Sequence, residues 1–143
     1  MKKIIIKVIG LATGIALMLI IFPVKSTYET KTYPDGVYIG YFLKGKRDGP
    51  GIFKWDNGDN YDGKWSDDKR SGHGIFSNKE GVYVGNWEDD KINGFGEKVW
   101  NNGEKYIGNW VDGKRDGAGT FTDIEGNVRE GNWSNDRWVV NIR

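Results

Sequence analysis

Residues 61–81, which read YDGKWSDDKRSGHGIFSNKEG, decide the fold. The stretch begins with Tyr-x-Gly-x-Trp, passes through a short acidic and basic segment, and continues with Gly-x-Gly-x-Phe. Versions of this arrangement recur along the chain, with the leading position at residues 38, 61, 83, 106 and 129. Self-similarity at a fixed period of this length is the signature of a repeat architecture. The sequence therefore predicts a linear array of similar units.

Three positions define the unit: a tyrosine, a glycine two residues later and a tryptophan two residues after that. They are occupied by Tyr38, Gly40, Tyr61, Gly63, Trp65, Tyr83, Gly85, Trp87, Tyr106, Gly108, Trp110 and Trp133. The units lie near residues 38–60, 61–82, 83–105, 106–128 and 129–143, with a degenerate cap at 27–37. Atypical units at the two ends are expected of a repeat array.

Each unit has the pattern of a β-hairpin. Both halves alternate with a period of two, which is typical of strands, and Asn57-Gly58 is a strong hairpin-turn signal. Glycine weakens a strand unless something needs the space, so an aromatic ring is expected to lie over glycine on a neighbouring strand. A single hairpin cannot offset the entropy of ordering its backbone, which requires the units to stack. The prediction is an all-β fold of about five antiparallel β-hairpin repeats in one twisted open sheet.

The pattern resembles the MORN (membrane occupation and recognition nexus) repeat family. The resemblance covers roughly residues 33–143, and the segments 45–51 (GKRDGPG) and 113–119 (GKRDGAG) carry it most fully. The third unit departs from it, with Ile92 in place of arginine and Lys98 in place of the strand aromatic. The resemblance implies an attachment, oligomerisation or scaffold module, and lipid binding is often proposed for such repeats.

Residues 1–26 form a separate N-terminal segment. The uncharged run 8–24 would make a helix of ~25 Å, close to the ~30 Å hydrocarbon core of a bilayer. This single hydrophobic helix is expected to be either a retained membrane anchor or a cleaved signal peptide. Because Lys2, Lys3 and Lys7 favour the cytoplasmic side, both interpretations place the repeats outside the cytoplasm, in the periplasm, at the cell surface or secreted.

Charge argues against nucleic acid as a ligand. The whole chain carries a net charge of +1, and the four lysines of residues 1–26 leave the repeats mildly acidic. Affinity for nucleic acid and anionic lipid depends largely on basic side chains. The pairs Lys46-Arg47, Lys69-Arg70 and Lys114-Arg115 recur at one turn position. They are interpreted as a solvated edge rather than an anion-binding stripe, since acidic residues adjoin them.

No catalytic, cofactor or metal site is predicted. His73 is the single histidine and is expected to be an ordinary surface residue facing away from the aromatic row. The acidic clusters at 67–68 and 88–90 recur with the repeat, which favours a turn-forming role over calcium binding or glycoside hydrolysis. The glycines recur with the hairpins and not before a helix, so they do not form a phosphate-binding loop.

The leading hypothesis is a non-catalytic scaffold, attached to the membrane by residues 1–26 or exported, that binds a protein through its repeat surface or a free sheet edge. Open edges also predict self-association. A lipid- or envelope-glycan-binding module is the alternative. The face opposite the aromatic row is mostly polar, except at Ile39 and Tyr41, which are candidate surface-contact residues.

Overall fold

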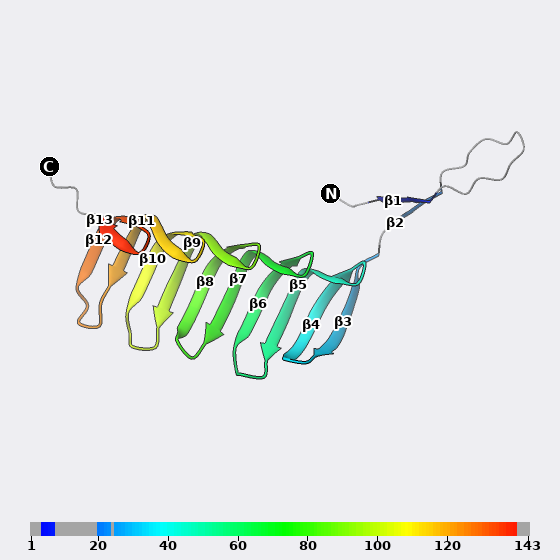
Figure 1. Ribbon diagram of the computed structural model, residues 1–143, viewed down its shortest axis with the longest axis horizontal. Helices are drawn as coiled ribbons and strands as arrows, with labels where there is room; N and C mark the ends of the chain where they lie inside the picture. Colours follow the sequence, from blue (N-terminus) through cyan, green and yellow to red (C-terminus); the bar gives the residue numbers. More distant parts are fainter. Residues whose placement is uncertain (1–3, 8–19, 24, 140–143) are drawn as a thin grey trace, which may run out of the picture.

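The computed structural model describes residues 4–7, 20–23 and 25–139, and its main part is one open antiparallel sheet of 11 strands (Figure 1). The strands follow one another in sequence order, so every neighbour in the sheet is a neighbour in the chain. They are β3 (Thr27–Tyr33), β4 (Gly36–Leu43), β5 (Lys46–Trp55), β6 (Asn60–Ser66), β7 (Lys69–Asn78), β8 (Gly81–Glu88), β9 (Lys91–Trp100), β10 (Lys105–Val111), β11 (Lys114–Thr122), β12 (Val128–Ser134) and β13 (Arg137–Val139). The predicted all-β fold and single open sheet are confirmed.

The N-terminal prediction falls largely outside the described residues. A separate two-stranded sheet pairs β1 (Ile4–Lys7) with β2 (Ile20–Pro23). Residues 8–19 and 24, most of the predicted helix, are not among the described ones, so the helix stays a prediction. Within the part of the chain that the structure describes, there is no helix with the length and apolar character needed to cross a bilayer.

The core lies on one face of the sheet, here called the inner face, and consists of aromatic side chains. The repeat tyrosines are 0–1% exposed, and the aromatic residue at the fifth position, phenylalanine in the first unit and tryptophan in the others, is also buried. Each tyrosine lies over a pair of glycines that face each other across two strands, such as Gly63 and Gly74 beneath Tyr61. The predicted packing of an aromatic ring over glycine is confirmed.

A β-bulge bends each hairpin so that its tip folds over the core. The register shifts between the glycine and the aromatic residue that follows it, for example between Gly63 and Trp65. The Tyr61 hydroxyl then donates a hydrogen bond to the Lys64 carbonyl at 3.0 Å. In Figure 1 the upper ends of the strands curl accordingly. The bend lets a single sheet bury large rings, because the ring is covered by the tip of its own unit and of the next.

The acidic residues form the hairpin turns, as predicted. Asp67 and Asp68 both have positive φ, 50° and 72°, and Asp89 and Asp90 repeat this arrangement. Two successive residues with φ > 0 produce the tight turn whose twist matches that of the flanking strands. The recurrence of aspartate here therefore reflects backbone conformation, since Asp tolerates the left-handed region better than most residues.

Burial of the tyrosines predicts a loss of stability at high pH. Desolvation raises the pKa of Tyr38 and of Tyr83 to about 12, and it also raises the pKa of Tyr61 and Tyr106 above 10. The unfolded chain ionises its tyrosines near pH 10, whereas burial in the folded array keeps Tyr38 and Tyr83 neutral until about pH 12. The contribution of these buried tyrosines to stability should therefore be constant below pH 10, and stability should fall between pH 10 and 12. Urea unfolding followed by circular dichroism across this range, with tyrosinate absorbance as the second readout, tests it; a flat profile would contradict it.

Candidate functional site

Arginine side chains link each repeat to the next across the inner face. Arg47 donates from Nε to Oδ1 of Asp68 at 3.2 Å and from Nη2 to the Asp68 carbonyl at 2.7 Å. Its guanidinium lies 4.1 Å from the ring centroid of Trp65. Arg70 and Arg115 make the same contacts with the aspartate and tryptophan of the following unit. We call this set the arginine ladder.

The arginine ladder corrects one interpretation of the sequence. The Lys-Arg pairs were expected to form a solvated edge, but the arginine side chains are only 18–20% exposed. The lysines do lie at the surface, as in the exposed pair Lys69–Asp89 at 3.2 Å. The arginine points over the core because the bulge turns the hairpin tip inward, and the aromatic rings attract its delocalised charge.

Three hollows follow the inner face and together form what we call the aromatic groove. One, of about 410 Å³, is lined by Tyr33, Phe53, Trp55 and Trp65 together with charged residues. The second, of about 370 Å³, lies over the third repeat, and the third, of about 550 Å³, is lined by Trp100, Phe121, Trp133 and Trp138. Each has an aromatic wall and a charged rim, a combination suited to holding side chains of another molecule.

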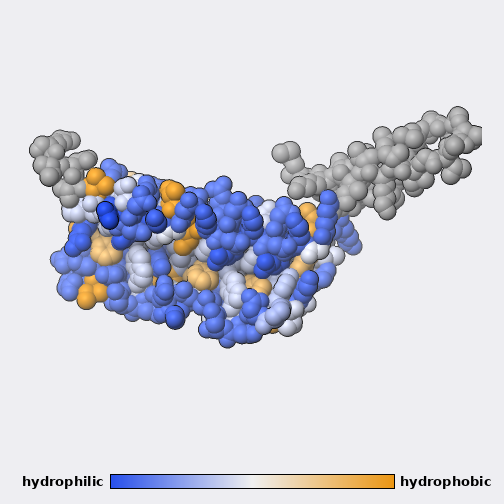
Figure 2. Space-filling view, in the orientation of Figure 1, coloured by the Kyte–Doolittle hydropathy of each residue, from blue (hydrophilic) through white to orange (hydrophobic). Residues whose placement is uncertain are grey.

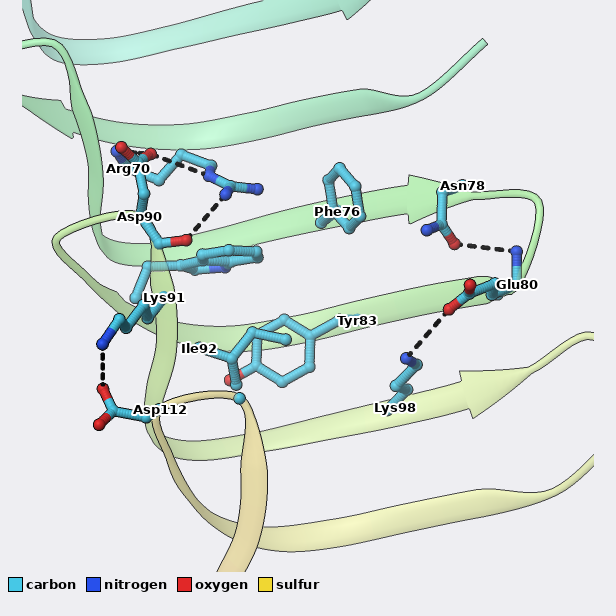
Figure 3. Close-up of a pocket in the computed structure, with 13 residues that line it drawn as sticks. Arg70, Phe76, Asn78, Glu80, Tyr83, Asp90, Lys91, Ile92, Lys98 and Asp112 are labelled. Carbon is cyan, nitrogen blue, oxygen red and sulfur yellow. Dashed lines mark hydrogen bonds and ion pairs between the residues drawn. The ribbon is translucent and has the colours of Figure 1, made fainter. Parts of the chain in front are cut away.

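Figure 3 shows the middle hollow. Phe76, Tyr83 and Ile92 form its apolar wall, and Lys98 lies at the rim, 4.0 Å from a carboxylate oxygen of Glu80. Ile92 stands where the other repeats place the ladder arginine, and Lys98 stands where they place phenylalanine. This hollow therefore differs in chemistry from the two on either side of it.

Half-exposed aromatic residues form the groove floor, and sequence reasoning did not single them out. Trp55 packs against Phe53, with ring centroids 4.5 Å apart, and Trp100 contacts Phe121 at 6.4 Å. Both tryptophans end the second strand of a hairpin, but the same place in the second and fourth units holds Asn78 and Asp123. Their placement at alternate units is the signal that could have identified them.

The candidate contact residues Ile39 and Tyr41 lie on the opposite, outer face. Ile39 is half-buried and faces Ile52 across the β4–β5 pair, while Tyr41 is 39% exposed and meets the Tyr28 ring edge-on at 5.1 Å. The outer face was expected to be mostly polar apart from these two residues. It is less polar than that, since it also exposes Ile75, Val82, Val84, Phe95 and Val99. Figure 2 shows a mainly hydrophilic surface interrupted by separate apolar patches.

The remaining candidates have simple surroundings. His73 is exposed on the outer face opposite Asn86. In the described part of the chain, no group of three or more histidine or acidic side chains is placed to hold a metal ion.

The repeat pattern also agrees with a known family. The family model for the MORN repeat matches four segments, residues 38–60, 61–81, 83–105 and 106–128, which together cover more than half of the chain. No curated protein matches the sequence.

Proposed function

This chain belongs to the MORN repeat family, and from that premise we propose that it is a non-catalytic interaction scaffold that binds a protein partner in the aromatic groove. The observation that carries the proposal is the groove itself: three hollows with aromatic walls and charged rims on one face of a continuous sheet. Tryptophan, tyrosine and arginine are enriched among the few side chains that dominate the binding energy of protein interfaces.

We further propose that residues 1–26 attach the scaffold to a membrane, or direct its export, so that the repeats act outside the cytoplasm. Support comes from the uncharged run 8–24 and the lysines that precede it. A free edge, at β3 or at β13, would additionally allow self-association by strand addition.

A matched pair of variants tests where the partner binds. Trp55→Ser with Trp100→Ser removes two half-exposed rings from the groove, and Ile75→Ser with Phe95→Ser removes two exposed side chains from the outer face. Full-length protein, wild type or variant, is used to capture proteins from an extract of its own cells, and the captured set is quantified by mass spectrometry.

We expect proteins retained by the wild type and by the outer-face variant to be lost at least tenfold by the groove variant, with the circular dichroism spectrum unchanged. Retention of the same set by the groove variant would refute the groove as the binding site. Loss only in the outer-face variant would assign binding to the opposite face.

The second candidate, lipid or envelope-glycan binding, has one observation in its favour. Indole rings such as those of Trp55 and Trp100 offer flat apolar surfaces on which a sugar ring could stack. Co-sedimentation of the chain lacking residues 1–26 with anionic and neutral liposomes, at low and high salt, tests the lipid form. Pelleting that depends on lipid charge and salt would favour it, whereas a protein found in the supernatant throughout would leave membrane attachment to residues 1–26.

A further inference from the structure

Four junctions hold the repeats together, each being the place where the second strand of one unit pairs with the first strand of the next. They are β5/β6, β7/β8, β9/β10 and β11/β12. In a linear array, each unit contacts only its neighbours, so the stability of the whole depends on the strength of every junction. A junction with fewer contacts than the others is the place where opening begins.

Three of the four junctions share one set of side-chain contacts. At β7/β8, Arg70 hydrogen-bonds Asp90 and lies 4.2 Å from the Trp87 ring centroid. Phe76 contacts the same indole at 5.9 Å. The β5/β6 and β11/β12 junctions repeat all of these contacts, with the guanidinium 4.1 and 4.4 Å from the indole.

The β9/β10 junction has lost this set. Ile92 replaces the arginine, Gly113 replaces its aspartate partner, and Lys98 replaces the phenylalanine. The hairpin tip keeps the exposed pair Lys91–Asp112 at 3.0 Å and the backbone hydrogen bond from Gly113 N to the Ile92 carbonyl at 2.9 Å. Three side-chain hydrogen bonds and two aromatic contacts found at the neighbouring junctions have no counterpart here.

Other contacts persist and show that the sheet itself is continuous. Six residue pairs join β9 to β10, from Lys105↔Val99 to Trp110↔Gly94. Trp110 still contacts Tyr83, at 5.7 Å, and donates from Nε1 to the Gly96 carbonyl at 3.3 Å. Trp100 also contacts Phe121 across this junction, at 6.4 Å, and Lys105 pairs with Glu97 at 3.8 Å. The β7/β8 junction has a smaller deficit of its own, because Trp87 Nε1 has no hydrogen-bond partner among the described residues. It nevertheless keeps the complete arginine and phenylalanine contacts.

We propose that the β9/β10 junction divides the array into two cooperative blocks, β3–β9 and β10–β13, and that the array opens there first. Opening at this junction breaks fewer side-chain contacts than opening at any of the other three, although its strands are paired as theirs are. The two blocks can therefore change their relative orientation, or separate transiently, while each keeps its own arginine ladder intact.

Native-state hydrogen exchange on the full-length chain tests the division. We expect amides of β10–β12 to exchange together, at least tenfold faster than those of β5–β8, with the step located between β9 and β10. A gradual increase toward the C-terminus, without a step at that place, would mean simple end fraying and would overturn the proposal.

A triple substitution provides the complementary test. Ile92→Arg, Lys98→Phe and Gly113→Asp install the residues of the other junctions. Position 113 accepts aspartate, since its φ of 82° resembles that of Asp68 and Asp90 and its Cβ would meet no atom within 4 Å. The difference in amide exchange rate between the two sides of the β9/β10 junction should shrink at least tenfold. An unchanged difference in a folded variant would overturn the proposal.

The reciprocal variant is the matched control. Arg70→Ile, Phe76→Lys and Asp90→Gly place the residues of the weak junction between β7 and β8. A second step in exchange is expected there, which would separate β3–β7 from β8–β9. Its absence would show that these side chains do not determine where the array opens.

Discussion

Trp65→Ala is expected to lower the free energy of unfolding by about 3–5 kcal/mol, as is typical when a buried tryptophan is truncated. The indole is 2% exposed and packs edge-on against Tyr38 and Tyr61, at 5.4 and 5.2 Å. Its Nε1 donates to the Gly51 carbonyl at 3.0 Å, so the substitution also leaves a buried acceptor without its donor. Because small domains have only about 5–15 kcal/mol of stability, this loss is a large share of the total, and the urea midpoint should fall accordingly.

Trp138→Ala is the control for this experiment. Trp138 lies in the last strand and is 43% exposed, so its truncation should lower the free energy of unfolding by less than about 1 kcal/mol. Urea unfolding followed by far-ultraviolet circular dichroism measures both variants without relying on tryptophan fluorescence. Equal losses from the two substitutions would show that the inner-face core does not hold the array together.

Gly74→Ala is expected to lower the free energy of unfolding by about 3 kcal/mol, although it adds only a single methyl group. The new Cβ would lie 2.6 Å from Cε2 of Tyr61, closer than two non-bonded carbon atoms can approach. Tyr61 is fully buried, and its hydroxyl is held by the Lys64 carbonyl, so the ring has no free space into which to move. The strand must shift, which disturbs its pairing with both neighbours.

Gly113→Ala separates crowding from backbone strain. An added Cβ there meets no atom within 4 Å, but φ is 82°. The substitution should therefore lower the free energy of unfolding by only about 1 kcal/mol, from backbone strain alone. Thermal unfolding of the two variants side by side should therefore show a clearly larger loss for Gly74→Ala. The same small loss in both would mean that the tyrosine can move aside.

Local periodicity allowed most of the fold to be predicted. The alternation of Gly63 with two aromatic residues indicated both the strand and the side on which the core lies, since a pleated strand places every second residue on one face. The left-handed turn residues Asp67 and Asp68 were also identifiable as turn-forming residues, because the cluster recurs with the hairpin. These are features in which each unit obeys rules that act within it.

Features that join units were not predictable in this way. Arg70 belongs to an exposed-looking turn, and its aspartate partner is 20 residues further on, in the next unit. Only the bulge, which changes the direction of the hairpin tip, brings the two together over an indole. The groove tryptophans Trp55 and Trp100 were not predicted for a related reason. They recur only at alternate units, so a search for positions shared by every unit does not find them.

The ladder also limits how the gene could have grown by duplication. The second unit carries both partners: Asp68, which accepts hydrogen bonds from the arginine of the preceding unit, and Arg70, which donates to the aspartate of the following unit. Copying that unit in tandem would pair Arg70 with a second Asp68 and leave the ladder complete. Copying the third unit would set Ile92 against Asp90, and copying the fourth would set Arg115 against Gly113. These two units are complementary halves, which a duplication would have to carry together.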